Sequence, residues 1–316
     1  MARHVHSLFD LPADTRKNSD YSGCRASDML IQQVINGITQ GSIYALVAIG
    51  FVLIFGTMNM VSFAHGETFM IGAFLGYFAI QVFNLPLLMG LLIAFAGGWI
   101  VGFLTELLAF RTLRGAIHMP PLLITVGLSI IIKEIAGNRI GHENRAMPYF
   151  YETTFRFGTF RISLLQVIIL GTVAILVLLL QLLIYKTKLG MAMRAVSQDY
   201  RMAGLLGINV DFLYNVSFSL ASGLGAVAGV LVAVYYNAVS PGMGGVPGLK
   251  GFAACVVGGL TSIPGAIIAG LSIGVIENLT VEFLSSGYRD TVAFILLILI
   301  LCIRPQGLMG KKIKVY

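Results

Sequence analysis

The chain has 316 residues, of which 57% are hydrophobic and only 11% are charged. Because soluble domains carry about 25% charged residues, this composition excludes an ordinary soluble protein. Apolar runs of about twenty residues predict an all-α fold, a polytopic transmembrane helical bundle of about eight hydrophobic segments. The net charge of +7 lies in loops and tails, so it indicates orientation in a membrane and not binding to nucleic acid.

Residues 1–28 form a polar stretch with charges of both signs before the first apolar run. They show neither the apolar core nor the cleavage site of a signal peptide, so we expect a disordered cytoplasmic tail. Met29 directly precedes the apolar run, and an alternative is that residues 1–28 reflect the choice of start site. The membrane domain is expected at residues 29–310, followed by a basic cytoplasmic tail at residues 311–316.

The first span is expected at residues 30–55, and a polar interruption follows at residues 57–78. Asn59, His65 and Glu67 lie there, between two apolar runs. Ionisable groups at membrane depth are costly and usually face the interior of a bundle or a wet cavity. A plainer alternative places His65 and Glu67 at the membrane surface, in a short connection between spans.

The residues on both sides of this interruption form an ordered series of motifs. The series is Asn36-Gly37, Gly41-Ser42-x-Tyr44-Ala45-Leu46, Gly50, Gly56 and Phe63-Ala64-His65-Gly66-Glu67. It resembles the N-terminal signature of the branched-chain amino acid ABC permeases. The side chains that we expect to line or support a substrate path are Ser42, Tyr44, Asn59, His65 and Glu67. The alternative is that they fix a broken helix and never touch substrate.

Further spans are expected at residues 87–110, 120–140 and 162–185, with a polar, aromatic loop at residues 141–160. This loop would lie outside the cell if the N-terminal tail lies inside, and there it is a candidate contact for a periplasmic binding protein. Five apolar segments precede the next polar loop. If that loop and the tail both lie inside, one segment does not cross, and the segment with His65 is the best candidate for a broken or re-entrant helix.

The longest polar interruption of the second half is the loop at residues 186–211. Basic loops between spans tend to stay cytoplasmic, and the basic residues here are Lys186, Lys188, Arg194 and Arg201. On a helix that starts near Met191, one face would carry Ala192, Val196, Tyr200, Ala203 and Gly207. This pattern alone fits an amphipathic helix at a membrane surface. The loop also resembles the coupling loop of bacterial ABC importer permeases, which docks on the ATPase subunit, at Arg194, Asp199, Ala203 and Gly207.

After a span at residues 213–236, glycine and proline interrupt the apolar sequence over residues 237–278. Irregular backbone at membrane depth must be buried by protein or line a cavity. Interrupted segments at residues 57–78 and 242–275 occupy comparable places in the two halves, which suggests an internal repeat with a binding site between the interrupted helices. Residues 258–274 also resemble the C-terminal half of the permease family, and a last apolar run leads to the basic tail.

Glycines four residues apart recur within the apolar runs. This spacing places both on one helix face, where they let neighbouring backbones approach closely. We expect these glycines to pack helices and not to bind a ligand. The pairs are Gly37 with Gly41, Gly72 with Gly76, Gly98 with Gly102, Gly225 with Gly229, and Gly270 with Gly274.

The sequence lacks a phosphate-binding motif of the type Gly-x4-Gly-Lys-Ser/Thr, so the chain does not draw energy from ATP by itself. It also lacks nucleophile-elbow, zinc-ligand and paired-carboxylate patterns, so we expect no enzyme, metal site or cofactor. The resemblance implies the permease of an ABC importer in the bacterial inner membrane, surrounded by lipid, with both termini in the cytoplasm. Its implied partners are a second homologous permease, two ATP-binding cassette subunits that bind the ATP, and a periplasmic substrate-binding protein.

Branched-chain amino acids are the main cargo of the family that the chain resembles, and close relatives with the same His-Gly-Glu stretch carry urea and short amides. An alternative of another class is an ion-coupled secondary carrier, which needs buried carboxylates or cation sites at mid-membrane. Glu67 and Glu277 are the candidates for that role. A passive channel is a further alternative. Both would function without an ATPase, so docking of an ATPase subunit separates them from an ABC importer.

Overall fold

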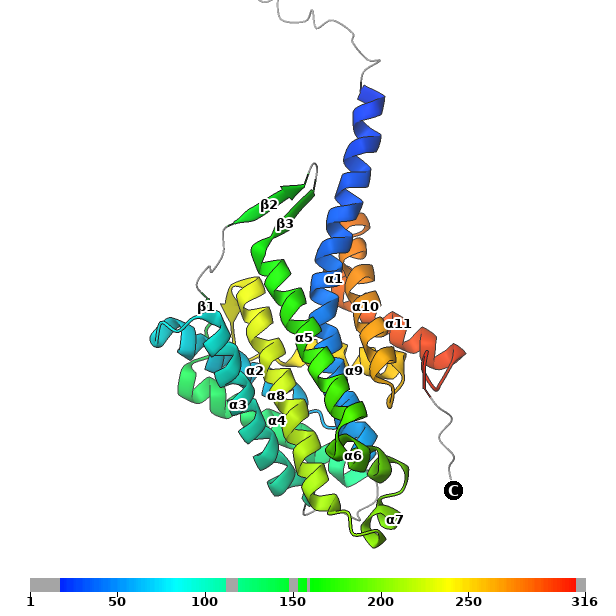
Figure 1. The fold of residues 1–316 in the computed structure, drawn as a ribbon. Helices are drawn as coiled ribbons and strands as arrows, with labels where there is room; N and C mark the ends of the chain where they lie inside the picture. The colour runs from blue at the N-terminus through cyan, green and yellow to red at the C-terminus, as the bar shows by residue number, and fades with distance from the viewer. Residues whose placement is uncertain (1–17, 112–118, 148–152, 158–159, 311–316) are drawn as a thin grey trace, which may run out of the picture.

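The computed structural model describes residues 18–111, 119–147, 153–157 and 160–310, and these parts of the chain are mostly helical (Figure 1). Within them, six helical stretches are long and apolar enough to cross a membrane. Shorter apolar helices stand where the sequence predicted interruptions. The predicted polytopic helical bundle is therefore confirmed.

The elements follow one another with few long connections. The helices are α1 (Asn18–Met58), α2 (His65–Tyr77), α3 (Leu87–Thr105), α4 (Met119–Ile140), α5 (Leu164–Lys186), α6 (Lys188–Gln198), α7 (Tyr200–Leu205), α8 (Val210–Tyr236), α9 (Gly245–Gly258), α10 (Ile263–Phe283) and α11 (Arg289–Ile303). π-helical turns extend α2 and α3, at Phe78–Val82 and Glu106–Phe110. Strand β1 (Arg145–Ala146) pairs antiparallel with β4 (Ala238–Val239), and β2 (Thr154–Phe157) forms a hairpin with β3 (Phe160–Ser163).

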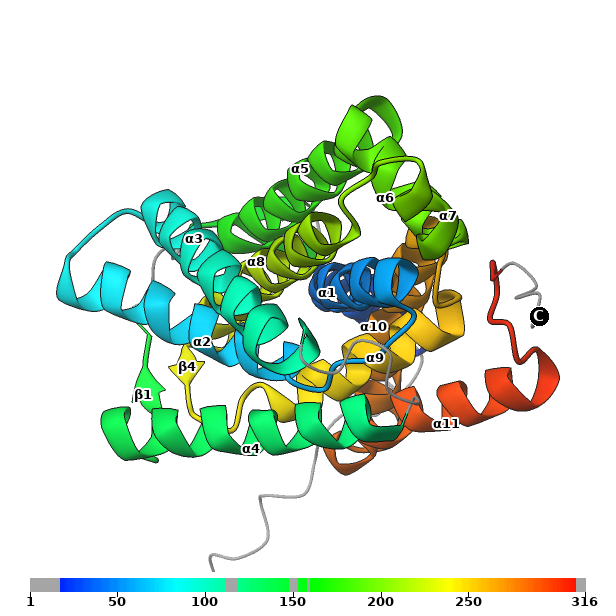
Figure 2. The same cartoon turned by 90° about the horizontal axis from the view of Figure 1, so that it is seen from below.

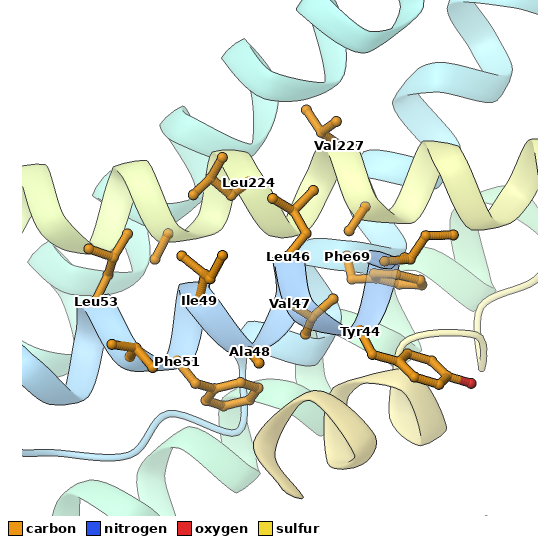
Figure 3. Packing of buried hydrophobic residues seen from close by; sticks show 14 of the residues in the cluster. Tyr44, Leu46, Val47, Ala48, Ile49, Phe51, Leu53, Phe69, Leu224 and Val227 are labelled. Carbon is orange, nitrogen blue, oxygen red and sulfur yellow. The ribbon is translucent and has the colours of Figure 1, made fainter. Parts of the chain in front are cut away.

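Helix α1 lies at the centre of the bundle, enclosed by α8, α9 and α10 (Figure 2). Its residues 43–54 are all buried. Leu46 and Leu53 point toward α8, whereas Tyr44 and Phe51 point to the other side (Figure 3). A helix with neighbours on several sides must be apolar almost all round, and the unbroken apolar run of α1 meets that requirement.

Glycines on both helices bring α1 and α10 to backbone contact. A Cβ atom on Gly37 would lie 2.6 Å from the Cα atom of Val275, and one on Gly270 would lie 2.6 Å from the backbone nitrogen of Ala45. Gly41 meets the backbone of Gly270, so the two helices run antiparallel. At such separations a side chain on any of these glycines would push the helices apart.

Gly274, the second glycine of the α10 pair, lies directly against the α1 pair. A Cβ atom on Gly274 would lie 2.5 Å from the carbonyl oxygen of Gly37, and it would also overlap the backbone of Gly41. Gly274 is buried. The two pairs expected from the four-residue spacing, one on α1 and one on α10, therefore face each other in a single helix contact.

Helices α2 and α8 pack equally closely but run parallel. A Cβ atom on Gly72 would lie 2.5 Å from the carbonyl carbon of Ala226. One on Gly229 would lie 2.9 Å from the carbonyl carbon of Phe69, and Gly76 faces the same helix one turn further along. Gly72 and Gly76 of α2 and Gly229 of α8, all from the expected glycine pairs, thus lie in the contact between these two helices.

Helices α2 and α9 both begin inside the bundle, and their first turns meet. A Cβ atom on Gly66 would lie 2.9 Å from the carbonyl oxygen of Gly244, and one on Gly248 would lie 2.9 Å from the Cα atom of Gly66. Irregular backbone at residues 59–64 precedes α2. The two interrupted segments expected from the sequence therefore lie against each other.

The start of α1 and the loop at residues 186–211 lie at opposite ends of the bundle (Figure 1). Near its start, α1 meets the β2–β3 hairpin, where the Arg161 backbone nitrogen donates to the Gln32 side chain over 2.9 Å. Its far end contacts α6. The expectation that the N-terminal tail and this loop share the cytoplasmic side does not fit this arrangement. Residues 1–28 carry four basic residues, as many as the loop, so the distribution of basic residues does not distinguish the two ends of the bundle.

Among the described residues before the loop, the helical stretches long and apolar enough to cross a membrane are Met29–Met58, Leu87–Phe110 and Leu164–Lys186. Helix α2, which begins at His65, has 13 residues and is not one of them, as expected for the interrupted segment. Residues 18–28, expected to belong to a disordered tail, form the first turns of α1. Residues 1–17 and the basic tail at 311–316 lie outside the described residues.

The variant Gly270→Leu should disrupt the bundle, because its side chain would overlap the backbone of α1 at Ala45. Overpacking of this kind costs about 1–3 kcal/mol or more, so we expect little folded protein in the membrane. Gly171→Leu is the matched control, since Gly171 of α5 is exposed and an added Cβ atom there meets nothing within 4 Å. The measurement is the monodisperse fraction on size-exclusion chromatography after extraction. Equal yields of the two variants would contradict the packing role.

Candidate functional site

Four charged side chains meet where α9, α10 and α11 approach the central helix. The Lys250 ammonium lies 2.6 Å from the Glu277 Oε1 atom and 2.6 Å from the Asp290 Oδ1 atom. The Arg289 Nε atom donates to the same Oε1 atom of Glu277, also over 2.6 Å. Two cations thus converge on one carboxylate oxygen, and a second carboxylate binds one of the cations. We call these four residues the ionic cluster.

Neutral polar groups of α1 and α8 complete the surroundings of the ionic cluster. The Gln40 amide donates to the Tyr44 hydroxyl, and its oxygen accepts from Arg289. Arg289 also donates to the Tyr236 hydroxyl over 2.7 Å. The Lys250 ammonium lies 5.4 Å from the centre of the Tyr44 ring, within range of a cation–π contact. The cluster is therefore tied to the centre of the bundle as well as to its last three helices.

Burial changes steeply across the ionic cluster. The side chain of Glu277 is 0% exposed and that of Lys250 is 3% exposed, whereas that of Asp290 is 57% exposed. Within the part of the chain that the structure describes, the buried Oε2 atom of Glu277 has no hydrogen-bond partner. Buried charges carry a large desolvation penalty even when they are paired. Inside a membrane protein such groups mark functional positions more often than structural ones.

Sequence reasoning did not find this cluster. It considered Glu277 as one of two carboxylates for an ion-coupled carrier, and gave Lys250, Arg289 and Asp290 no role. The available signal was one lone cation and one lone anion in consecutive apolar runs, at Lys250 and Glu277. Groups of opposite sign that are each costly at membrane depth can be expected to pair.

His65 lies in a slot between α1 and α8. Its side chain is fully buried, and its ring meets the Phe51 ring edge to face with centroids 4.8 Å apart. A Cβ atom on Gly50 would overlap the imidazole, and one on Gly225 would lie 3.0 Å from its Cε1 atom. Two glycines, one on each neighbouring helix, thus make room for the ring. The alternative of a surface position for His65 is excluded.

Glu67 joins α2 to α4. It is 5% exposed, and its Oε1 atom accepts a hydrogen bond from the Ser129 hydroxyl over 3.0 Å. The backbone nitrogen of Phe63, just before α2, donates to the Thr125 hydroxyl of the same helix. These contacts hold the irregular start of α2 against α4. Glu67 is therefore also buried, and the surface alternative is excluded for it too.

The five candidate path residues do not form one site. Tyr44 belongs to the surroundings of the ionic cluster, whereas His65 and Glu67 lie at the start of α2. The Ser42 hydroxyl donates to the carbonyl of Thr39 within its own helix, over 2.7 Å. Asn59 is exposed and ends α1 with a positive φ of 52°, a conformation that Asn tolerates better than most residues.

The loop at residues 186–211 contains two helices, not the single one expected from its periodicity. The chain breaks at Asp199, whose backbone is extended and whose carboxylate accepts from the backbone nitrogens of Arg201 and Met202 over 2.9 and 3.0 Å. As the N-cap residue, Asp199 thereby binds two backbone N–H groups in the first turn of α7 that have no carbonyl partner within that helix. The stretch of small and apolar residues is therefore divided between α6 and α7 and does not form one continuous face.

The remaining candidates of this loop have distinct positions. The Arg194 guanidinium lies over the Tyr185 ring at 5.4 Å from its centre. Ala203 is buried against the bundle. Gly207 has a φ of +83° and ends α7 in open space, where an added Cβ atom would meet nothing within 4 Å.

Apolar residues of α6 and α7 lie both toward the bundle and on the exposed surface of the loop. Met193 and Val196 of α6 are buried toward the bundle. Leu205 and Leu206 at the end of α7 are 82% and 81% exposed. Exposed apolar side chains concentrated on a polar loop mark a surface for another protein more often than for solvent.

Comparison with known proteins places this geometry in a family. The pattern of the family described as Branched-chain amino acid transport system / permease component matches residues 33–301. The high-affinity branched-chain amino acid transport system permease protein BraD of Pseudomonas aeruginosa is 38% identical over 89% of this chain and 96% of its own length. LivH of Escherichia coli K12, with the same description, is 35% identical over the same shares, and a probable LivH of Methanocaldococcus jannaschii is 29% identical over 91% and 96%. No solved structure gives a significant match.

A double-variant cycle can test whether Gly50 makes room for the imidazole ring of His65. Gly50→Ala should destabilise the protein, because the added Cβ atom would overlap the imidazole. In the background of His65→Ala the ring is absent, so the same substitution should be tolerated. We expect an interaction free energy of about 0.5–3 kcal/mol between the two positions, measured from thermal unfolding in detergent. Equal losses in both backgrounds would show that the glycine does not serve the ring.

Proposed function

The chain belongs to the family of branched-chain amino acid transport permease components, and we propose that it is the membrane-spanning permease subunit of an ABC importer for branched-chain amino acids. The observation that carries this proposal is the match to the family over residues 33–301, almost the whole of the bundle. The relatives BraD and LivH are both described as permeases of high-affinity branched-chain amino acid transport systems. This favours that cargo over urea or short amides.

The loop formed by α6 and α7 is the proposed docking site for an ATP-binding cassette subunit. Its basic residues favour the cytoplasmic side, where ATP is available. The exposed apolar residues Leu205 and Leu206 supply a surface for a groove in the partner. Helix α6 contacts α1, α5 and α8, so a displacement of the loop by the partner would reach the central helix directly.

The remaining parts of the proposed machine follow from this orientation. With α6 and α7 inside the cell, the β2–β3 hairpin and the start of α1 face outside, where a periplasmic binding protein delivers the amino acid. A second homologous permease forms the other wall of the path, and two ATP-binding cassette subunits bind the ATP. Closure of those subunits tilts the permeases and switches the path from outward to inward.

The first test is uptake of labelled leucine by cells that express this chain with its neighbouring subunits. Uptake should require an intact ATPase and should be inhibited by isoleucine and valine but not by urea. An inactive ATPase with an altered phosphate-binding lysine is the matched control. Uptake that persists with this control would contradict an ABC importer, and ATP-dependent uptake of urea in place of leucine would contradict the cargo.

A second test addresses the loop. Asp199→Ala removes the cap of α7, at a cost of about 0.5–2 kcal/mol for that helix, and Gly207→Val strains a positive φ by about 1–2 kcal/mol. Both variants should retain folded protein and ATP hydrolysis while leucine uptake falls. Asp199→Asn and Gly207→Asn are the matched controls, because Asn caps helices and tolerates this φ, and they should retain uptake. Normal uptake in both test variants would contradict the docking role.

A further inference from the structure

We infer that the ionic cluster binds the charged head of the transported amino acid, its α-carboxylate and α-ammonium groups. This inference rests on the proposed function and assigns the part of the path that recognises the zwitterion. It starts from the side chains of Lys250, Glu277, Arg289 and Asp290, which carry two positive and two negative charges within one set of contacts. A site with both signs and no net charge matches a ligand with both signs and no net charge.

The members of the cluster differ in how freely they can be replaced. Asp290 is the exposed member, with 57% of its side chain accessible, and it holds Lys250 through one carboxylate oxygen at 2.6 Å. Lys250 and Glu277 are buried and are held by several neighbours. An incoming carboxylate can therefore exchange with that of Asp290 at the Lys250 ammonium, and leave the remaining contacts in place.

The Oε2 atom of Glu277 supplies the complementary position. It is buried, and the described residues offer it no hydrogen-bond partner, although the Oε1 atom of the same carboxylate binds both Lys250 and Arg289. A carboxylate oxygen without a partner is costly inside a protein. The α-ammonium of an amino acid whose carboxylate lies on Lys250 would satisfy it. Both charges of the zwitterion then have a named partner.

The position of the cluster agrees with entry from outside the cell. Arg289 donates to Tyr236 at the end of α8, which is the end opposite to α6 and α7, and Tyr236 is 44% exposed. From there the contacts lead inward through Gln40 to the buried Glu277. The cluster thus extends from an exposed edge at the outer side to the centre of the bundle.

The inference makes opposite predictions for the two carboxylates. Glu277→Gln removes the partner of the ammonium and should weaken leucine binding by about tenfold or more, as expected for a lost hydrogen bond between charged groups. Asp290→Asn removes the group that competes with the leucine carboxylate and should tighten leucine binding. If the cluster only anchors α11, both variants would shift binding in the same direction or leave it unchanged.

The experiment measures equilibrium binding of tritiated leucine to the purified transporter complex in lipid nanodiscs, with the binding protein omitted. Leucine should displace the label, whereas leucinamide and 4-methylpentanoate, which each lack one of the charges, should compete at least about tenfold less well. Glu282→Gln is the matched control, since Glu282 lies on α10 but binds Gln33 outside the cluster. It should bind leucine like the unaltered complex.

Outcomes separate this inference from the proposed function. ATP-dependent leucine uptake together with equal binding in Glu277→Gln, Asp290→Asn and Glu282→Gln would overturn the inference and leave the function standing. Absence of ATP-dependent leucine uptake by the unaltered complex would overturn the proposed function itself. If Glu277→Gln fails to assemble, the variant at the exposed Asp290 still tests the inference. Unchanged or weaker leucine binding by Asp290→Asn would overturn it. Equal competition by leucinamide and leucine would overturn it as well.

Discussion

The constraint on which the rest of the bundle depends is the backbone contact around α1. A helix enclosed by other helices has no room for large side chains on every side. Gly37 and Gly41 have no side chain at the place where α1 meets Gly270 and Gly274 of α10, so the two backbones can touch there. On another side, Gly50 leaves space for the ring of His65. In lipid there is little hydrophobic gain from bringing helices together, so close packing of this kind supplies much of the attraction. The glycines thus fix where α2, α8 and α10 lie.

The ionic cluster depends on that packing. Gln40 and Tyr44 lie on α1 one turn from the glycine contacts, and they meet Glu277 because α10 approaches so closely. Lys250 reaches the same carboxylate from α9, the short helix whose first turn lies against the first turn of α2. The interrupted helix is therefore what brings a cation to mid-bundle. The same contacts tie α11 to α1 and place a charged site between the centre of the bundle and the end of α8 that lies opposite to α6 and α7.

The sequence predicted the helical bundle, the two interrupted segments and the loop that carries α6 and α7, because each has a local signal in hydropathy, glycine content or charge. It could not predict that α6 and α7 are separate, since Asp199 continues the helical periodicity while its carboxylate caps the next helix. It also placed the N-terminal tail on the loop's side, whereas the start of α1 lies at the end of the bundle opposite to the loop. The ionic cluster was missed for a different reason: Lys250 and Glu277 are 27 residues apart, and only tertiary packing pairs them.

The central claim is that energy enters this permease at α6 and α7 from an ATP-binding cassette partner. The most direct measurement is site-specific photocrosslinking from position 205 in the assembled transporter, since Leu205 at the end of α7 is 82% exposed. Phe83, which is 70% exposed and follows α2 toward the other end of the bundle, is the control position. We expect a crosslink to the ATPase subunit from position 205 and none from position 83. An ATPase subunit crosslinked from position 83, or from neither position, would contradict the account.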